Sequence, residues 1–271
     1  MRRRRIRQFP FVTTLIAVAA LSTGCDHSAA PGPTTNTSTS STAPQATSST
    51  TPATSAPANP DSGVSQGQTY GITIISIDGA TADDRGRWHG RVAQLSGGDP
   101  RVADAFNKAS KASANGQIEP VRAAADPDAE WLLELNPTLT FRPTAIAELI
   151  VGVYSARHAA HPTNSVSTIA IDSRTAKPIT LADLFRNQQD GLNRLSEQTK
   201  IIFPQVYGGT TPDEEGARPI ADNFANWIPT SAGMELHFND YQFGHGLPVI
   251  TVPWSALTDV LAPDMLALTH N

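Results

Sequence analysis

Two histidine groups have the residue types and spacing that come closest to chemistry. His158 and His161 are separated by two alanines, so their imidazoles can share a metal ion if they converge. Gly244-His245-Gly246 places an imidazole between two flexible residues near Tyr241, where it can act as a general base or a binding contact. The alternative, which we favour, is that the first pair are loop histidines and that His245 lies in a hairpin turn whose backbone needs glycine.

Motifs of known catalytic and cofactor sites are missing. The sequence has no Gly-x-Ser-x-Gly elbow and no phosphate-binding Gly-x-x-x-x-Gly-Lys loop, and Glu235-Leu236-His237 lacks the histidine spacing of a zinc peptidase. The run Asp213-Glu214-Glu215 has no regular oxygen-ligand spacing, so a solvated loop is favoured over a calcium site. One cysteine permits no internal disulfide. We expect no metal and no cofactor, and we favour binding over enzymatic activity.

Four tryptophans are candidates for stacking on sugars: Trp88, Trp131, Trp227 and Trp254. Their strand-like surroundings make packing in the core the default. We retain Trp227 as a candidate binding residue, together with Tyr241, His245, His158 and His161.

The first 25 residues have the features of a bacterial export signal. A basic stretch from Arg2 to Arg7 precedes an apolar run that is short for a membrane helix and ends in Leu21-Ser22-Thr23-Gly24-Cys25. This end resembles the lipobox of bacterial lipoproteins. The resemblance implies that residues 1–24 are removed and that Cys25 carries a lipid that holds the protein on the extracytoplasmic face of the cell membrane. An ordinary secretory signal with a chance cysteine is the alternative, and the export route stays open.

A tether follows the cysteine. Residues 26–60 contain 16 Ser or Thr and six Pro, and none of the large apolar residues. Such a composition cannot offset the entropy of ordering, so we expect residues 25–65 to be disordered. The segment is interpreted as a spacer, with O-linked glycosylation as an open alternative.

The remaining sequence is acidic. From Ser65 onward there are 15 Lys and Arg against 23 Asp and Glu. This balance excludes the concentrated basic surface that nucleic-acid binding needs. No later stretch reaches the roughly 20 apolar residues of a membrane span.

Periodicity in the body predicts strands broken by single helices. Strands are expected over 70–78, 88–95, 131–141, 147–154, 165–172, 234–238, 241–243 and 247–253, and helices over 100–114, 181–185, 190–203 and from Ser255 onward. The strands over 131–172 are predicted to form an antiparallel meander, because their connections are too short for crossovers. Thr180 and Asp183 have the spacing of a capping box. The order predicts an α+β fold: a mostly antiparallel sheet with helices packed on one face.

The second half resembles a known extracytoplasmic domain in several strings. These are Gly152-Val153-Tyr154, Ala160-His161-Pro162, residues 169–185, 222–227 and 233–238, Tyr241, and Val252-Pro253-Trp254. They are similar to the C-terminal domain of the anti-sigma factor RsiV, which secreted and lipid-anchored mycobacterial proteins of the immunogenic-antigen type share. The resemblance covers about 152–268, and it divides the body into an N-terminal part, 66–151, and an RsiV-like domain, 152–271.

This resemblance implies an exported α+β module. RsiV-type relatives bind lysozyme, others accompany a cell-wall glycan deacetylase domain, and many have no assigned activity. The sequence offers no sigma-binding segment, so anti-sigma signalling is not expected. We therefore expect a non-catalytic module that binds a protein, with lysozyme as one candidate, or a cell-wall glycan. A weak esterase or a glycan hydrolase or deacetylase that uses His245, or His158 and His161, is the alternative.

Overall fold

The structure is a computed structural model that describes residues 61–270. Cys25 and most of the predicted tether lie outside the described residues. All described residues belong to one compact unit. Within residues 61–270, no helix has the length and apolar character needed to cross a membrane.

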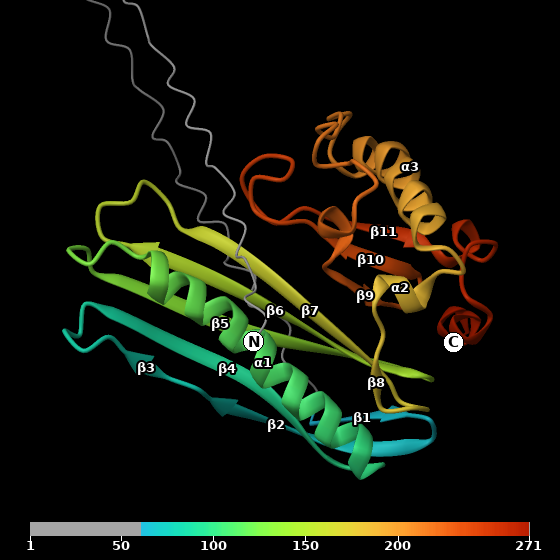
Figure 1. The fold of residues 1–271 in the computed structure, drawn as a ribbon, viewed down its shortest axis with the longest axis horizontal. Helices are drawn as coiled ribbons and strands as arrows, with labels where there is room; N and C mark the ends of the chain where they lie inside the picture. Colours follow the sequence, from blue (N-terminus) through green and yellow to red (C-terminus); the bar gives the residue numbers. More distant parts are fainter. Residues whose placement is uncertain (1–60, 271) are drawn as a thin grey trace, which may run out of the picture. The chain divides into compact units, whose positions relative to one another are not determined.

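A large sheet of eight strands forms the first part of this unit (Figure 1). Its strands are β1 (Ser62–Ser65), β2 (Gln68–Ser76), β3 (Gly79–Ala80), β4 (Gly86–Gly97), β5 (Trp131–Arg142), β6 (Ala145–Ala156), β7 (Thr163–Asp172) and β8 (Lys177–Pro178). They follow the order β1-β2-β4-β5-β6-β7-β8, with β3 beside β4. The predicted meander is confirmed, because β6 pairs antiparallel with both β5 and β7. The pair β4–β5 is parallel, which the sequence did not predict.

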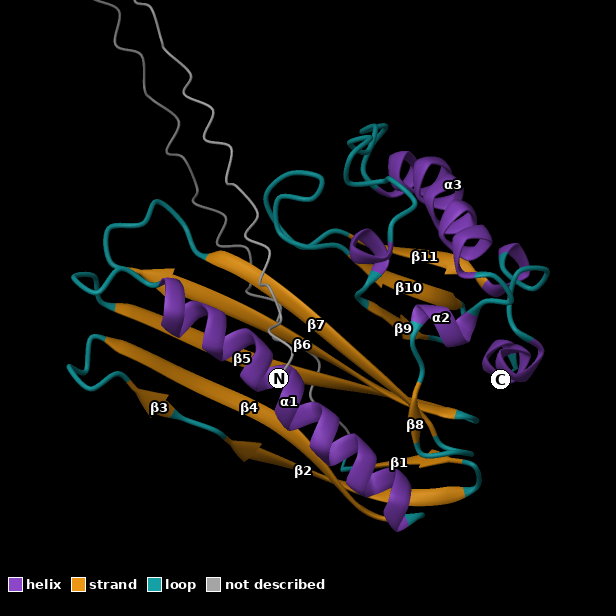
Figure 2. Cartoon of the chain, viewed as in Figure 1, coloured by secondary structure: helices purple, strands orange, loops and turns teal. Residues whose placement is uncertain are grey.

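A smaller antiparallel sheet and the helices complete the unit (Figure 2). Its order is β11-β10-β9, from β9 (Trp227–Pro229), β10 (Gly233–His237) and β11 (Val249–Pro253). The α-helices are α1 (Pro100–Ala124), α2 (Leu181–Leu184) and α3 (Gln188–Val206), and the 3₁₀ helices are η1 (Ala221–Phe224), η2 (Trp254–Ala256) and η3 (Pro263–Thr269).

Successive side chains of a strand point to opposite faces of a sheet, and both faces of the large sheet are covered. On one face Ile146 and Ile171 pack against Phe106 of α1. On the other, Ala147 and Ala170 belong to the core that includes the small sheet and α3. The α+β prediction is confirmed. The small sheet is an additional layer, covering the face opposite α1.

Helix starts agree with local sequence signals. Asp99 caps α1 by accepting from the Arg101 amide at 2.9 Å, and Pro100 follows it. The helix continues to Ala124, beyond the predicted end at 114. The predicted capping box at α2 is confirmed, since Thr180 and Asp183 bond each other's backbone amides at 3.0 and 3.3 Å.

Two predicted elements are wrong. Residues 241–243 form a tight turn, in which Tyr241 has a left-handed φ of 65° that a strand cannot accommodate. The helix expected from Ser255 is replaced by η2, turns and η3. Tertiary contacts account for this: the carbonyl of Val260 accepts from the Arg186 amide at 2.9 Å, and Leu261 forms a β-bridge with Phe185.

The edges of the predicted segments also differ in detail. Ser62–Ser65, placed in the tether by composition, form β1 and pair with β2. Residue 151, where the sequence analysis divided the body, lies inside β6.

Strand β4 separates from β5 halfway along. The two pair only over Gly86–Gly90 and Trp131–Leu135. Farther along β4, Asn107 of α1 accepts from the Leu95 amide at 2.6 Å and donates to the Leu95 carbonyl at 3.0 Å. Glu148 of β6 accepts from the Ala93 amide at 3.2 Å. Side chains thus replace a missing strand at this gap.

Candidate functional site

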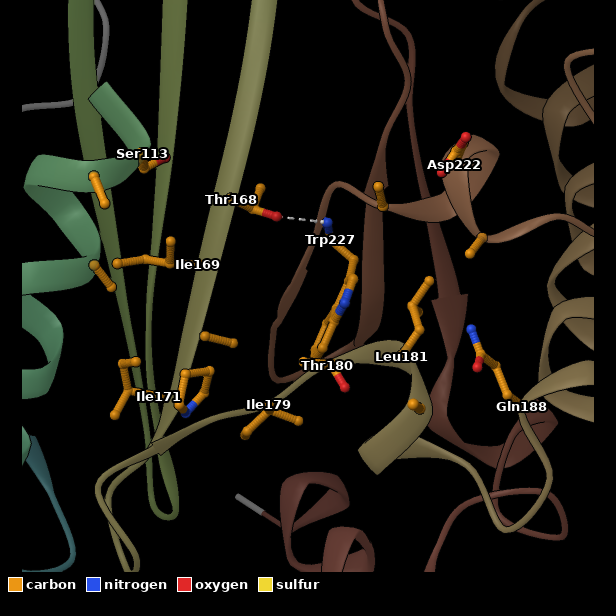
Figure 3. A pocket seen from close by; sticks show the side chains of 17 residues that line it. Ser113, Thr168, Ile169, Ile171, Ile179, Thr180, Leu181, Gln188, Asp222 and Trp227 are labelled. Atoms are coloured by element: carbon orange, nitrogen blue, oxygen red, sulfur yellow. Dashed lines mark hydrogen bonds between the residues drawn. The ribbon is translucent and has the colours of Figure 1, made fainter. Parts of the chain in front are cut away.

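A groove of about 630 Å³ lies beside the last part of β7, where Thr168 to Ile171 line it. Its walls come from α1, β7, the segment from β8 to α2, η1 and the start of β9. Figure 3 shows Ile169 and Ile171 on the α1 side of β7, and Trp227 and Leu181 on the other side. The volume falls in the range of about 300–1,000 Å³ that is usual for ligand sites. The lining residues are Ala109, Ala112, Ser113, Thr168, Ile169, Ala170, Ile171, Pro178, Ile179, Thr180, Leu181, Ala182, Gln188, Ala221, Asp222, Ala225 and Trp227.

The floor of the groove is an open strand edge. Strand β8 pairs only with Ile171 and Asp172, so over 163–170 the sole strand neighbour of β7 among the described residues is β6. An antiparallel strand directs the N–H and C=O of one residue to the same side, and the side alternates along the chain.

Two bonds establish which residues face outward. The carbonyl of Ala170 accepts from the Ile179 amide at 2.8 Å, and the amide of Asn164 donates to Asp240 Oδ2 at 2.8 Å. By alternation the N–H and C=O of Thr168 face outward as well. Within residues 61–270, no backbone or side-chain group bonds to either.

Trp227 forms the far wall of the groove. Its side chain is buried, as the default interpretation of core packing predicted, yet one surface borders the groove. Its backbone amide donates to Thr168 Oγ1 at 3.0 Å, the dashed line in Figure 3, which ties β9 to β7. The structure therefore places this candidate in the groove wall.

Asp222 supplies the charge of the groove. It is the one lining residue with a charged side chain among those that the structure describes, and no described cation forms an ion pair with it. It lies on η1, and Figure 3 shows it on the Trp227 side of the groove. The sequence alone does not single out Asp222, because nothing in the local pattern separates it from other surface carboxylates.

Three of the candidate residues meet in a second place, beside the start of β7. The rings of His161 and His245 lie 4.4 Å apart between centroids, and the Tyr241 ring is 5.3 Å from that of His245. The Tyr241 hydroxyl and His161 Nε2 are 3.2 Å apart, and His161 Nδ1 lies 3.0 Å from the Pro162 carbonyl. Because a carbonyl only accepts, these two bonds fit a proton on Nδ1 and donation from tyrosine to Nε2.

Asp240 organises this cluster, and sequence reasoning missed it. Its side chain is 2% exposed. Oδ1 accepts from the Gly246 amide at 2.7 Å and contacts His245 Nδ1 at 3.1 Å. Burial opposes ionisation of Asp240, but the hydrogen bonds from the amides of Asn164 and Gly246, with His245 alongside, outweigh it and hold the pKa below its ordinary value. An aspartate before a glycine-rich turn was the available signal.

The Asp240–His245 pair resembles half of a catalytic triad. An Nδ1 proton shared with a carboxylate leaves Nε2 as a base. Within residues 61–270, no Ser, Thr or Cys side chain bonds to His245 or His161, so the nucleophile of a triad is missing from the cluster.

His158 lies apart from the cluster. Its backbone has a left-handed φ of 69°, and its side chain borders a surface depression with Asp126 and Arg157. Thus two imidazoles converge, but they are His161 and His245 rather than the i, i+3 pair. Cys25 lies outside the described residues.

The acidic loop is tied to nearby cations. Lys200 pairs with Glu214 at 2.6 Å and Arg218 with Glu215 at 3.2 Å, while Asp213 accepts from the Glu215 amide. In residues 61–270, no group of three or more His, Cys, Asp or Glu side chains is arranged to hold a metal ion.

Comparison with known proteins identifies the fold alone. No protein-family model and no curated protein matches this chain. A crystal structure of a DUF3298 family member from Bacteroides fragilis is similar, with a TM-score of 0.54 and 12% identity over 73% of this chain and 96% of that one. A DUF3298 family protein from Pseudomonas aeruginosa gives a TM-score of 0.48 and 14% identity over 74% of this chain and 97% of that one. The chain therefore has a fold similar to that of a domain of unknown function.

Proposed function

We propose that this protein is a lipid-anchored extracytoplasmic module that binds a protein partner and catalyses no reaction. One observation carries the proposal: a largely apolar groove lies along an open strand edge, and its lining holds Asp222 as its single charged side chain among the described residues. Apolar walls with a few convergent polar groups are typical of recognition sites.

The location rests on the sequence. The lipobox-like ending at Cys25 supports a diacyl anchor on the extracytoplasmic face, and two acyl chains suffice for stable attachment. Mass spectrometry of the protein from membranes should find an acylated N-terminal Cys25. A Cys25→Ala variant should leave the membrane fraction. An unacylated product, or unchanged membrane retention of the variant, would contradict the anchor.

Lysozyme is the partner that the RsiV-like resemblance suggests. Lysozyme is basic, and the sequence from Ser65 onward is acidic, so electrostatic steering would speed association. A cell-wall glycan is the second partner class. Its contact with the groove would not depend on a basic residue in the partner.

A binding measurement with the full chain tests this function. The detergent-solubilised protein is passed over immobilised lysozyme, over peptidoglycan fragments, and over ribonuclease A as a basic protein control. Saturable binding to lysozyme or peptidoglycan that ribonuclease A does not reproduce supports the proposal. Equal binding to all surfaces, or none, overturns these partner assignments.

The Asp240–His245 pair favours a second candidate, a weak esterase or a glycan hydrolase or deacetylase. Purified protein is assayed on aryl esters and acetylated glycans, with the variants His245→Ala, Asp240→Asn and His161→Ala. His158→Ala is the matched control, because His158 lies outside the cluster. Turnover lost in the first three variants and kept in the control would establish an enzyme and refute the non-catalytic proposal.

A further inference from the structure

We infer that the partner binds as an added strand on the outer edge of β7, through an extended segment that carries a lysine or arginine facing Asp222. This inference rests on the proposed binding function and specifies how the groove recognises its partner. It concerns the side of β7 between the Asp240 loop and Ile179.

The unpaired backbone defines the partner's shape. Thr168 presents one donor and one acceptor to the groove, and the Ala170 amide faces the same way by alternation. Donors and acceptors that alternate along a strand edge match the backbone of another strand, which is the basis of recognition by strand addition.

The open stretch has defined ends. At one end the Asn164 amide donates to Asp240, and at the other the Ala170 carbonyl accepts from the Ile179 amide. Between Asn164 and Ala170 the strand is about 20 Å long at roughly 3.3 Å per residue. The groove is lined by the part of this stretch from Thr168 onward, and a partner segment of about six residues matches the distance between the two ends.

The walls select a single strand. Helix α1 and η1 both contribute to the lining, so each side of the edge is flanked. A second copy of this chain that paired through its own β7 would bring its α1 and η1 to the same place, so this flanked edge suits a segment without covering layers. An isolated extended segment has no such covering layers and enters the groove.

Charge and size indicate the side chains of that segment. Because successive side chains of a strand alternate, one set faces α1 and the other faces Trp227 and Asp222. Ala109 and Ala112 leave room on the α1 side. Asp222 has no ion-pair partner within the described residues. A cation among the partner side chains that face Trp227 and Asp222 is therefore complementary to it.

A hexapeptide tests these features directly. The probe is acetylated, amidated and fluorescently labelled Thr-Val-Thr-Lys-Thr-Val, which places valine and lysine on one face and threonine on the other. Binding to the full chain is followed by fluorescence anisotropy. One comparison peptide has glutamate in place of lysine, and another is N-methylated at the amides that would face β7.

Thr168→Pro is the decisive variant. It removes the outward N–H and fills that side of the strand. It breaks no bond to β6, because the Thr168 amide points away from β6, and proline is tolerated at such edge positions. Thr168→Val is its matched control, since both variants lose the hydroxyl bonded to Trp227 and only valine keeps the amide.

We expect Thr168→Pro to bind the peptide at least about tenfold more weakly than Thr168→Val, because at least one backbone hydrogen bond is lost. The N-methylated peptide should lose a similar factor on the wild-type protein. The glutamate peptide should bind about tenfold more weakly at low salt, with a smaller difference at high salt. Asp222→Asn should remove most of that preference for lysine.

Equal affinity of Thr168→Pro and Thr168→Val, or of the methylated and unmethylated peptides, overturns the inference. If Thr168→Pro does not fold, the N-methylated peptide on wild-type protein decides. Lysozyme or peptidoglycan binding that is unaffected by the folded Thr168→Pro variant refutes strand addition and leaves the binding function in place. If the wild-type chain binds neither lysozyme nor peptidoglycan nor the peptide, both the binding function and strand addition are refuted.

Discussion

Strands β4 and β7 both have backbone groups that no neighbouring strand pairs, and the molecule treats them differently. At β4 the groups of Ala93 and Leu95 are bonded by Glu148 and Asn107, inside the layer between the sheet and α1. At β7 the groups of Thr168 face a groove, and within residues 61–270 nothing bonds them. An internal gap is thus closed by polar side chains, whereas an edge of the same sheet stays unpaired within the described residues.

Closing the β4 gap carries an electrostatic cost. Glu148 is 1% exposed, and Oε2 has no hydrogen-bond partner within the described residues. Burial raises the pKa of Glu148 from 4.5 to about 7, against the opposing hydrogen bonds from Ser110 and Ala93. At the end of the open edge the buried acid is Asp240, and hydrogen bonds from the Asn164 and Gly246 amides hold its pKa below the ordinary value. The comparison therefore predicts that stability depends on the β4 gap and binding on the β7 edge.

The largest effect is expected at Glu148. Because its pKa is raised in the folded state, the folded protein retains a proton that the unfolded chain loses above pH 4.5. The contribution of Glu148 to the free energy of unfolding is fully present below pH 4.5. This contribution, roughly 3 kcal/mol, is lost as the pH rises through about 7. Urea unfolding from pH 4 to 8 should show this loss in wild type and not in Glu148→Gln. If the free energy of unfolding changes with pH in the same way in both proteins, Glu148 is not the group responsible for the loss.

Asn107→Ala should cost slightly less. It leaves the buried amide and carbonyl of Leu95 without partners, which destabilises by about 2 kcal/mol. Thermal unfolding at fixed pH measures the change. Asn115→Ala, on an exposed position of α1, is the control and should change stability by less than about 0.5 kcal/mol. Equal effects of the two variants would show that Asn107 does not close the gap.

Asp240→Ala tests the end of the open edge. The variant removes the acceptor of the Asn164 and Gly246 amides and should destabilise by about 1–2 kcal/mol at neutral pH. Since the pKa of Asp240 is lowered in the folded state, its contribution is present above pH 3.8 and is lost as the pH falls through the folded-state pKa. The two proteins should therefore converge in acid. A constant difference down to the lowest pH at which both fold would contradict this role.

The smallest change in stability is expected at the open edge itself. Thr168→Val loses one hydrogen bond from the Trp227 amide at a half-buried site and should cost less than about 1 kcal/mol. Chemical denaturation checks the value. A cost as large as that of Asn107→Ala would mean that the edge is part of the structural core and would remove the contrast between the two strands.

Local signals in the sequence predicted much of the fold. The alternation of β5, β6 and β7 gave the meander, and the pair Thr180 and Asp183 gave the start of α2, because these patterns depend on near neighbours in the chain. The parallel pairing of β4 with β5 was not predictable, since side-chain periodicity is the same for both strand directions.

The candidate site depends on contacts between distant segments. The sequence named His161, Tyr241 and His245, but their meeting requires Asp240 to bond Asn164 of β7. The spacing of His158 and His161 suggested a pair, yet the turn at His158 separates it from the cluster. The open edge of β7 has no signature in sequence, because it results from how short β8 is and from where η1 and β9 pack.

The most direct test is amide hydrogen exchange of the full chain, read residue by residue before and after the lysine peptide is added. We predict that the Ala93 and Leu95 amides are protected throughout, while the Thr168 amide exchanges rapidly in the free protein and slowly in the complex. A Thr168 amide that is already protected in the free protein, or unchanged at saturating peptide, would contradict it.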